Sequence, residues 1–377
     1  MTGWLDALES LASSRAKAGL TRRLRPRSPG DPVVDLAGND YLGLAAHPAV
    51  IEASAQSLRA YGLGATGSRL VRGSAAAHAE LESELAAWLG AESALVFSSG
   101  YLANLAAVRS LTAVCDLIVS DAYNHASLID GCKISGVRTV VAPHNSPAAV
   151  AALLDAHPGR ALVVTESVFS VDGDLAPLAE LHAVTSARGA LLLVDDAHAL
   201  GLLGPSGAGG VSAAGLAGHS DVVVTATLSK SLGGAGGVVA GPAQFTRHLI
   251  DTGRTFIYDT ALPPAVAAGV HEALRLARSA DDRRSVLASR AAQTVSRLSA
   301  AGFEVSPPVA GVLSVLAPGP EAALAWAEDC RDRGVAVGCF RPPSTPDGSS
   351  RLRLTLNAGV SDADFARALD VIVECSP

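Results

Sequence analysis

Residues 161–198 read ALVVTESVFSVDGDLAPLAELHAVTSARGALLLVDDAH, and this stretch decides the fold. Two short runs rich in Val and Leu, 161–165 and 190–194, enclose a segment with the length and period of a helix. Pro177 and Gly189 suit the first turn and the C-cap of that helix. The order strand, helix, strand is that of a βαβ unit, which predicts a parallel sheet buried on both faces.

The same alternation extends on both sides of this unit. Further predicted strands lie at 94–97, 117–120, 139–142, 222–225 and 237–240. Beyond about residue 280 a long helix at 285–301 precedes predicted strands at 303–306, 312–316, 335–339 and 351–356. We therefore expect an α/β chain with an N-terminal helix and arm (1–45), a large domain with a mainly parallel central sheet (46–280) and a smaller C-terminal α+β domain (281–377).

Composition excludes several classes of function. The chain has 377 residues, of which 49% are hydrophobic, so it can bury a large core. Its 29 basic and 36 acidic residues give a net charge of −7, which argues against a nucleic-acid partner. Every apolar run is interrupted before the ~18 residues of a membrane span, and no secretory signal is recognisable. The five cysteines are widely spaced and contain no Cys-x-x-Cys, so we predict neither disulfides nor a zinc site and expect a cytoplasmic location.

Lysine is rare in this chain. Of the 29 basic residues 26 are arginine, and the three lysines are Lys17, Lys133 and Lys230. Lys230 lies in TATLSKSLGG (225–234), directly after a predicted strand. Arginine neither loses its proton nor forms a Schiff base, whereas a crowded lysine can have a lowered pKa and a nucleophilic amine. We therefore predict a functional role for Lys230 and ordinary surface positions for the other two.

Polar residues follow three other predicted strands. SSGY (98–101) opens a helix, so it is either a phosphate cradle or a simple helix cap. DDAH (195–198) lies where open α/β sheets bind ligands, but its two carboxylates point to opposite sides of an extended chain, which favours a turn cap over a metal site. His125, in NHAS (124–127), could stack on a planar ring or begin a helix.

Together these groups form a set suited to pyridoxal phosphate: a lysine, an acid, a stacking histidine and a phosphate cradle. From NDYLG (39–43) to RLRL (351–354), the chain resembles the fold-type-I pyridoxal-phosphate-dependent transferases and, within them, the α-oxoamine synthase family. The resemblance covers nearly the whole length. It implies a large cofactor-binding domain, a smaller C-terminal domain and no metal.

The resemblance also implies a role for individual residues. Lys230 would hold the cofactor covalently and then move the Cα proton of the amino-acid substrate. Asp195 would contact the pyridine nitrogen, His198 the phenolic oxygen and His125 the ring face. Further implied cofactor contacts are Gly100, Tyr101, Ser170 and Thr227. Implied substrate contacts are Asn39, Arg341, Ser344 and Arg353, the last for the amino-acid carboxylate.

The segment CFRPPS (339–344) distinguishes members of the family, although Ser344 stands where threonine is more usual. It favours a decarboxylative condensation of L-alanine with a pimeloyl thioester, carried by coenzyme A or an acyl-carrier protein, in biotin synthesis. The alternatives are a sister synthase that uses glycine with a short acyl-CoA, another fold-type-I enzyme, and a binding protein with a degenerate site. Family members commonly place arginine where this chain has Thr21, so we expect Arg22 or Arg23 to replace it.

A glycine-rich loop supplies the last expectation. GLGATG (62–67) matches the letters of a dinucleotide fingerprint, but residues 51–61 before it are helical in period and not a strand. We therefore predict a flexible loop. Residues 62–72 and 256–260 resemble segments that reach the active site across a two-fold axis in this family, which implies a homodimer.

Overall fold

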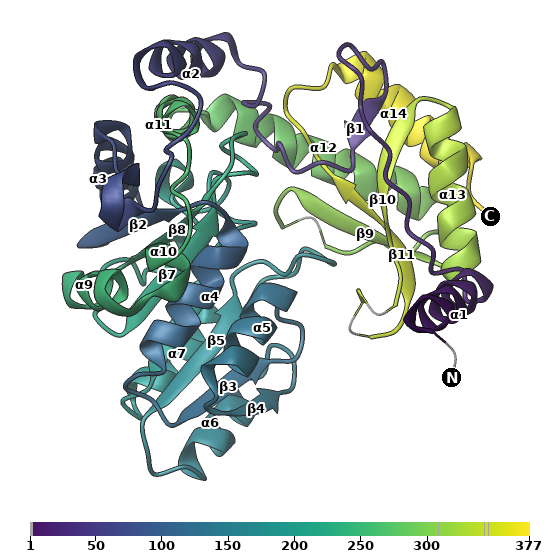
Figure 1. Cartoon of the computed structure of the whole chain (residues 1–377). Coiled ribbons are helices and arrows are strands. Elements are labelled where there is room, and N and C mark those ends of the chain that lie inside the picture. Colours follow the sequence, from purple (N-terminus) through teal and green to yellow (C-terminus); the bar gives the residue numbers. More distant parts are fainter. Residues whose placement is uncertain (1–2, 308, 343, 346) are drawn as a thin grey trace.

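The computed structural model describes residues 3–307, 309–342, 344–345 and 347–377. Its larger sheet has the strand order β2-β8-β7-β6-β5-β3-β4 (Figure 1). These strands are β2 (Ser93–Phe97), β3 (Leu117–Asp121), β4 (Arg138–Ala142), β5 (Ala161–Glu166), β6 (Leu191–Asp195), β7 (Val222–Thr227) and β8 (Gly237–Gly241). Strand β8 is antiparallel to both neighbours and the other neighbouring pairs are parallel, so the mainly parallel sheet is confirmed.

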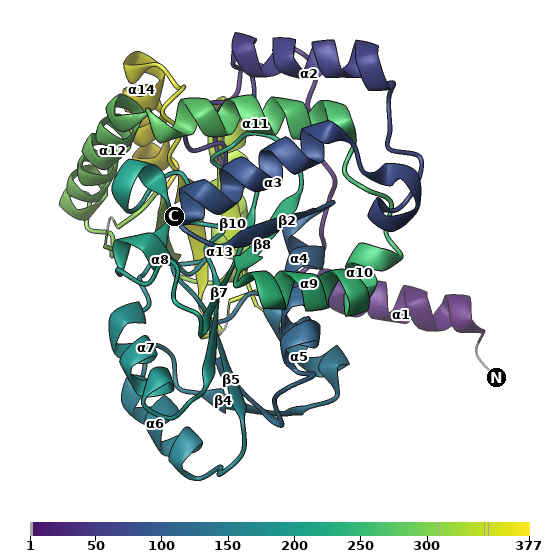
Figure 2. The ribbon, with the colours of Figure 1, turned by 90° about the vertical axis from the view of Figure 1, so that its left-hand side faces the viewer.

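Helices cover both faces of this sheet (Figure 2). On β6, Leu193 packs with the residues of α4 (Gly100–Leu111) and α5 (Ala126–Ser135). Its neighbours Leu192 and Val194 face the other way, toward α6 (Pro147–Asp155) and α7 (Leu178–Ser186). Alternate side chains of a strand point to opposite faces, so a continuous apolar run is what a sheet covered on both sides requires.

The predicted βαβ unit is present as β5, α7 and β6. Pro177 is the N-cap of α7, one position before the helix, and Gly189 lies beyond its end with φ of +64°. A positive φ costs glycine little, so Gly189 lets the chain turn back into β6. The remaining elements of the large domain are α2 (Pro48–Tyr61), a short π-helical turn (Arg69–Gly73), α3 (Ala76–Leu89), a 3-10 turn (Pro205–Gly207), α8 (Gly210–Ala213), α9 (Ala243–Thr252), α10 (Arg254–Ile257) and α11 (Pro264–Arg278).

A second sheet has the order β1-β10-β11-β9. It contains β1 (Val34–Leu36), β9 (Val312–Ala317), β10 (Val335–Phe340) and β11 (Ser350–Thr355), with helices α12 (Asp281–Ala300), α13 (Pro320–Asp332) and α14 (Asp362–Glu374). The predicted strand 303–306 is wrong: it forms only an isolated bridge between Val305 and Val315. Gly302 turns the chain before this segment with φ of +93°, and Pro307, which lacks an N–H donor, follows it.

The N-terminal arm connects the two sheets. After α1 (Trp4–Lys17) it runs beside β10 as far as β1, which pairs in parallel with β10 (Figure 1). Helix α2 precedes the glycine-rich loop 62–67, so the strand that a dinucleotide fingerprint needs is replaced by a helix, as predicted.

None of the described helices is long and apolar enough to span a membrane.

Candidate active site

The predicted site residues gather at one edge of the large sheet. Asp195 ends β6, Lys230 follows β7, His125 follows β3 and Gly100 follows β2. Strand β2 runs in the same direction as β7 because both are antiparallel to β8. The carboxyl ends of these strands therefore meet at the edge where open α/β sheets bind ligands.

A short chain of hydrogen bonds ends at the Lys230 amine. The Tyr41 hydroxyl lies 2.6 Å from His198 Nδ1, and His198 Nε2 lies 2.7 Å from Lys230 Nζ. Burial raises the pKa of Tyr41, so the phenol keeps its proton and can donate it to Nδ1. The imidazole proton then resides on Nε2, from which it can be donated to a neutral lysine amine.

The pKa of the Lys230 amine is lowered, so a larger fraction of this amine is neutral near physiological pH than for an ordinary lysine. Burial lowers its pKa to about 8, against the opposing effects of Asp195 and Glu166. Burial, together with the charge of Lys230, lowers the pKa of His198 well below its usual value. A neutral amine is the form that attacks a carbonyl carbon, so Lys230 is suited to covalent attachment of an aldehyde.

Asp195 is held by two donors. Asn104 Nδ2 donates to its Oδ2 at 2.6 Å, and the backbone N–H of Ala197 donates to its Oδ1 at 2.9 Å. Asp196 has separate partners: its Oδ1 accepts from Ser167 Oγ at 2.5 Å and from the backbone of Gly210 at 2.9 Å, at the start of α8. The two carboxylates therefore serve different partners, and burial raises the pKa of Asp196 to about 6.

Two buried residues near Asp195 were missing from the sequence-based prediction. Asn104, on α4, also donates to Ser127 Oγ at 2.8 Å and accepts from Thr225 Oγ1 at 2.5 Å. Glu166 is the register partner of Asp195 on β5, and burial, followed by the charge of Asp195, raises its pKa well above the usual value. The sequence does contain a signal for each residue. Asn104 is an amide on an otherwise apolar helix face, and Glu166 is an acid at the end of an apolar strand.

His125 is the N-cap of α5. Its Nδ1 lies 2.7 Å from Ser127 Oγ and accepts from the Ser127 backbone at 3.2 Å. Its own backbone N–H donates to Glu166 Oε1 at 2.6 Å. Burial lowers the pKa of His125, which favours the neutral ring. The helix-capping alternative is thus correct, and it leaves the ring fixed at the same edge of the sheet as Lys230.

The segment 98–101 begins α4 and also caps it. Ser99 Oγ accepts from the backbone of Leu102 at 3.2 Å. Gly100 packs directly on β7, because a Cβ at this position would lie 3.0 Å from the Cβ of Thr227. The Tyr101 hydroxyl donates to Asp130 Oδ2 at 2.5 Å. Residues 98–101 can cap the helix and also bind a phosphate, because the positive end of the dipole of α4 faces the edge of the sheet that carries Lys230 and Asp195.

Arg353 reaches this edge from the small domain. Its Nη1 donates to the Ser170 carbonyl at 3.1 Å and its Nη2 to Asn39 Oδ1 at 3.2 Å. The guanidinium lies over the Phe340 ring, 4.6 Å from the centroid. The buried Arg353 Nε has no hydrogen-bond partner among the described residues. A donor left unpaired in this way favours an anionic ligand such as a carboxylate.

The arm meets the other predicted substrate residues. Arg22 Nη2 donates to Ser344 Oγ at 3.2 Å, and Arg341 donates to the Gly19 carbonyl. The structure thus brings Arg22 to Ser344 and places the arm beside Arg341, although more than 300 residues of sequence separate the arm from these two residues. Pro343, part of the predicted CFRPPS signature, lies outside the described residues.

The turn after β5 links the two domains. Asp172 Oδ1 accepts from Ser314 Oγ at 2.5 Å and also pairs with Arg351. Gly173, with φ of +74°, lies so close to β9 that a Cβ would come within 2.3 Å of the Val312 carbonyl oxygen. This close approach requires glycine. The turn therefore fixes the Ser170 carbonyl relative to the small domain.

A histidine between two carboxylates lies behind this turn. His144 Nδ1 is 2.8 Å from Asp121 Oδ1, and its Nε2 is 2.8 Å from Asp174 Oδ2. The ring stacks on Tyr123 with a centroid separation of 4.1 Å. Burial alone would lower the pKa of His144, but the hydrogen bonds to the two carboxylates outweigh burial and raise it to about 9. We conclude that His144 is protonated and has a structural role: it joins Asp121, at the end of β3, to Asp174, in the turn after β5.

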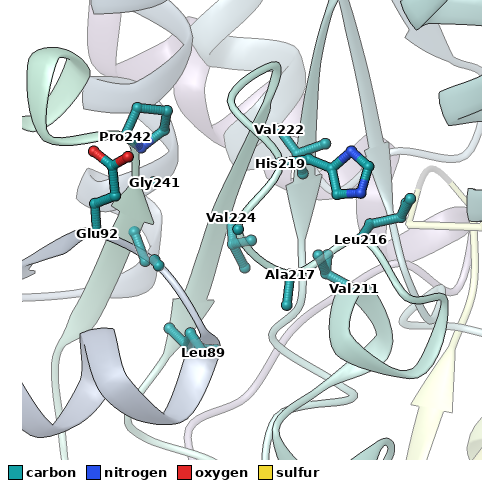
Figure 3. Close-up of a pocket in the computed structure, with 13 residues that line it drawn as sticks. Leu89, Glu92, Val211, Leu216, Ala217, His219, Val222, Val224, Gly241 and Pro242 are labelled. Carbon is teal, nitrogen blue, oxygen red and sulfur yellow. The ribbon is translucent and has the colours of Figure 1, made fainter.

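A small pocket lies elsewhere in the large domain (Figure 3). It is lined mainly by apolar side chains, among them Leu89, Leu216 and Val224, with Glu92 and His219 at its border. None of the predicted site residues lines it. Its chemistry offers no group suited to the cofactor, so the candidate site is the edge that carries Lys230.

Comparisons with known proteins agree with this geometry. The family model "Aminotransferase class I and II" matches residues 31–372. An 8-amino-7-oxononanoate synthase from Mycolicibacterium gilvum is 51% identical over 98% of this chain and 96% of its own. A serine palmitoyltransferase from S. paucimobilis with a bound PLP–myriocin aldimine is 31% identical, with a TM-score of 0.91 over 98% of this chain and 96% of its own. The 8-amino-7-oxononanoate synthase from Francisella tularensis is 27% identical, with a TM-score of 0.77 over 91% and 97%.

The chain belongs to the aminotransferase class I and II family of fold-type-I pyridoxal-phosphate-dependent enzymes. Within that family it groups with the 8-amino-7-oxononanoate synthases, which confirms the resemblance stated from the sequence.

The residues at the sheet edge fit this cofactor. Lys230 supplies an amine of lowered pKa, and Asp195 supplies a buried carboxylate held by Asn104. Gly100 begins α4 and packs directly on Thr227 of β7, so the positive end of this helix lies at the same edge of the sheet. The cofactor is therefore pyridoxal phosphate, and the chain is a pyridoxal-phosphate-dependent acyl-transferring enzyme.

Proposed function

We propose that this chain condenses L-alanine with a pimeloyl thioester to give 8-amino-7-oxononanoate, carbon dioxide and the free thiol carrier, a step of biotin synthesis. The names of relatives about half identical over nearly the whole chain support this substrate pair. The observation that carries the proposal is the lysine of lowered pKa, hydrogen-bonded to His198 beside a buried aspartate.

The residues at the sheet edge would hold the cofactor. Lys230 would hold it covalently, and Asp195 would keep the ring nitrogen protonated. His125 would cover the ring face, and His198 would contact the phenolic oxygen. The remaining cofactor contacts would be Gly100, Tyr101, Ser170 and Thr227. Pyridoxal phosphate, when bound, withdraws electrons from the α-carbon of an attached amino acid and so stabilises negative charge there.

Lys230 then acts as the proton carrier. Once alanine has replaced it on the cofactor, the freed neutral amine of Lys230 would take the Cα proton of alanine, a role supported by the pKa of about 8. The α-carbon forms a bond to the thioester carbonyl carbon, the C–S bond breaks and the thiolate leaves. The bond from the α-carbon to the alanine carboxylate then breaks with loss of carbon dioxide, and Lys230 returns the proton to the α-carbon.

The substrate side of the site consists of arginines and their partners. Arg353 binds the alanine carboxylate, supported by its unpaired Nε and its fork geometry. Asn39 orients Arg353 through the 3.2 Å hydrogen bond. Arg341, Ser344 and Arg22 lie along the acyl chain, with Arg22 in place of the arginine that the family commonly has at the Thr21 position.

The amino-acid and acyl substrates are tested together. Purified enzyme with pyridoxal phosphate and pimeloyl-CoA should release carbon dioxide and free thiol with L-alanine, and little with glycine or L-serine. Serine is included because a serine palmitoyltransferase shares the fold closely. Preference for glycine would identify the sister synthase instead. Release without any thioester would favour a different fold-type-I reaction.

We also propose that the enzyme is a homodimer. In the loop 62–72, the side chains of Leu63 and Val71 are each 84% exposed. In the segment 256–260, Tyr258 is 71% exposed. The Arg69 guanidinium lies over the Phe256 ring, 5.4 Å from its centroid, so the two predicted interface segments lie side by side. Burying such side chains against a second copy is favourable. Light scattering should give twice the chain mass, and an active monomer would contradict the proposal.

We also propose limits for the domains and a location for the protein. The division at 45 and 280 is supported by the short interval between α11 and α12, which end at Arg278 and begin at Asp281. Strand β1 of the arm, however, pairs with the small domain. A cytoplasmic location is supported by the free state of all five cysteines. Limited proteolysis and cell fractionation would test these two points.

A further inference from the structure

Three metal-ligating side chains meet at the edge of the large sheet opposite to Lys230. They are His182 on α7, and His219 and Asp221 in the turn that leads into β7. Among the described residues, they are the one group in which three such ligand atoms lie within 4.8 Å of one another. Lys230 follows the other end of β7, and a strand of six residues spans ~20 Å, so this cluster lies far from the candidate active site.

The backbone holds both parts of this cluster in place. The N–H of Val222 donates to the His219 carbonyl at 3.1 Å, which closes a tight turn around Asp221 (Figure 3). The Asp221 carbonyl accepts from the N–H of Leu192 on β6 at 2.9 Å. On α7, the side chain of His182 is only 12% exposed. A metal site needs ligands held by packing and hydrogen bonds, and these contacts supply that support.

The ligand atoms have separations that suit one divalent ion. His182 Nε2 lies 3.1 Å from both Oδ1 and Oδ2 of Asp221. Zinc bonds of ~2.1 Å to nitrogen and oxygen place neighbouring ligand atoms ~3.0–3.4 Å apart. The His219 ring is edge-on to the His182 ring, with 4.6 Å between the centroids and 85° between the planes. His219 is exposed, so its ring can turn toward a shared ion at small cost.

Two other histidines contact carboxylates without this arrangement. His144 contacts two carboxylates, but through its two different ring nitrogens, which point in opposite directions. His157 contacts a single carboxylate, that of Asp116, at 2.7 Å. Both are ordinary contacts between a histidine and an acid, and the pair of His182 with Asp221 alone would be another. The second imidazole, that of His219, is what favours a metal ion here.

We propose that His182, His219 and Asp221 bind a zinc ion, with water completing its coordination. Imidazole nitrogens and a carboxylate oxygen are among the ligands that zinc prefers in proteins. The ion joins α7 to the turn before β7, so it stabilises the large domain and takes no part in the reaction. The sequence predicts no zinc site because its cysteines lack the spacing of zinc ligands. These ligands instead come from either side of β6, and only the fold brings them together.

The test is zinc binding by holoenzyme that is purified without a histidine tag and freed of metal with a chelator. Zinc chloride is added in competition with a chromophoric zinc indicator, for wild type, His182→Gln, His219→Gln and the double variant. Wild type should bind a single zinc ion per chain, and each single variant should bind it about tenfold or more weakly. His157→Gln is the matched control, because His157 also pairs with an aspartate but belongs to no such group among the described residues. The control should bind zinc like wild type.

Two further measurements separate a metal site from a histidine–aspartate pair. Cobalt(II) in place of zinc should give visible absorption in wild type that His219→Gln reduces. Zinc should raise the melting temperature of wild type and leave that of the double variant unchanged. Equal zinc affinity in wild type and the double variant would overturn the proposal, and so would a wild type that binds no zinc. The cofactor absorbance and its change with L-alanine should be the same in all variants, and their loss in wild type would contradict the proposed function and not the zinc site.

Discussion

Asn104 provides the most informative single perturbation, because one side chain joins three buried polar groups. It donates to Asp195 at 2.6 Å and to Ser127 at 2.8 Å, and it accepts from Thr225 at 2.5 Å. The variant Asn104→Ala removes all three hydrogen bonds. Asp195 keeps only its bond from the Ala197 backbone at 2.9 Å.

The size of the effect follows from these contacts. A hydrogen bond to a charged group contributes about 1.5–3 kcal/mol and a neutral one about 0.5–1.5 kcal/mol. Because the variant also leaves buried groups unpaired, we expect the free energy of unfolding to fall by about 2–4 kcal/mol. Misorientation of Asp195 should raise the dissociation constant of pyridoxal phosphate about tenfold or more, which corresponds to about 1.4 kcal/mol.

The assay is titration of the apoprotein with pyridoxal phosphate, followed by absorbance, alongside urea unfolding. Ser110→Ala is a suitable control, since Ser110 is buried on the same helix and its hydroxyl has no hydrogen-bond partner among the described residues. The control should bind the cofactor like wild type. If Asn104→Ala also binds like wild type and loses only stability, Asn104 does not position Asp195 for the cofactor and the reasoning is refuted.

Three other residues give independent predictions. His144→Gln should lower the unfolding free energy by at most about 3 kcal/mol near pH 6. Because the pKa of His144 is raised from 6.5 to about 9, this stabilisation is complete below pH 6.5 and is lost as pH rises through about 9. If urea unfolding shows that the variant loses the same free energy of unfolding at about pH 6 and at about pH 10, the prediction is contradicted. Arg22→Ala should raise KM for the pimeloyl thioester about tenfold and leave KM for alanine unchanged, and an unchanged thioester KM removes Arg22 from the site. Attachment of pyridoxal phosphate to the apoprotein should accelerate as pH rises through about 8, where half of the Lys230 amine is neutral, and a pH-independent rate would count against the lowered pKa.

The central fold could be predicted because its signals are local. The runs 161–165 and 190–194 are apolar without interruption, and Pro177 and Gly189 mark the ends of the helix between them. Burial on both sides leaves such strands no polar face, which makes the pattern unambiguous. The small sheet was harder, because β1 joins β10 from the opposite end of the chain. Pairing between such distant segments leaves no local pattern in the sequence.

The site was predictable where a residue type is chemically unusual for its place. Lys230 was conspicuous in a chain with 26 arginines and three lysines. Asn104 and Glu166 were not, because a buried amide or acid is recognisable only once its partners are known.

The most direct test of the central claim is a borohydride experiment on purified wild type and Lys230→Ala. Visible spectra are recorded before and after reduction, and again with L-alanine or glycine added separately. The account predicts a cofactor band in wild type that reduction traps on the peptide containing Lys230, and that changes more with alanine than with glycine. Absence of the band after addition of pyridoxal phosphate, or trapping on another lysine, would contradict it.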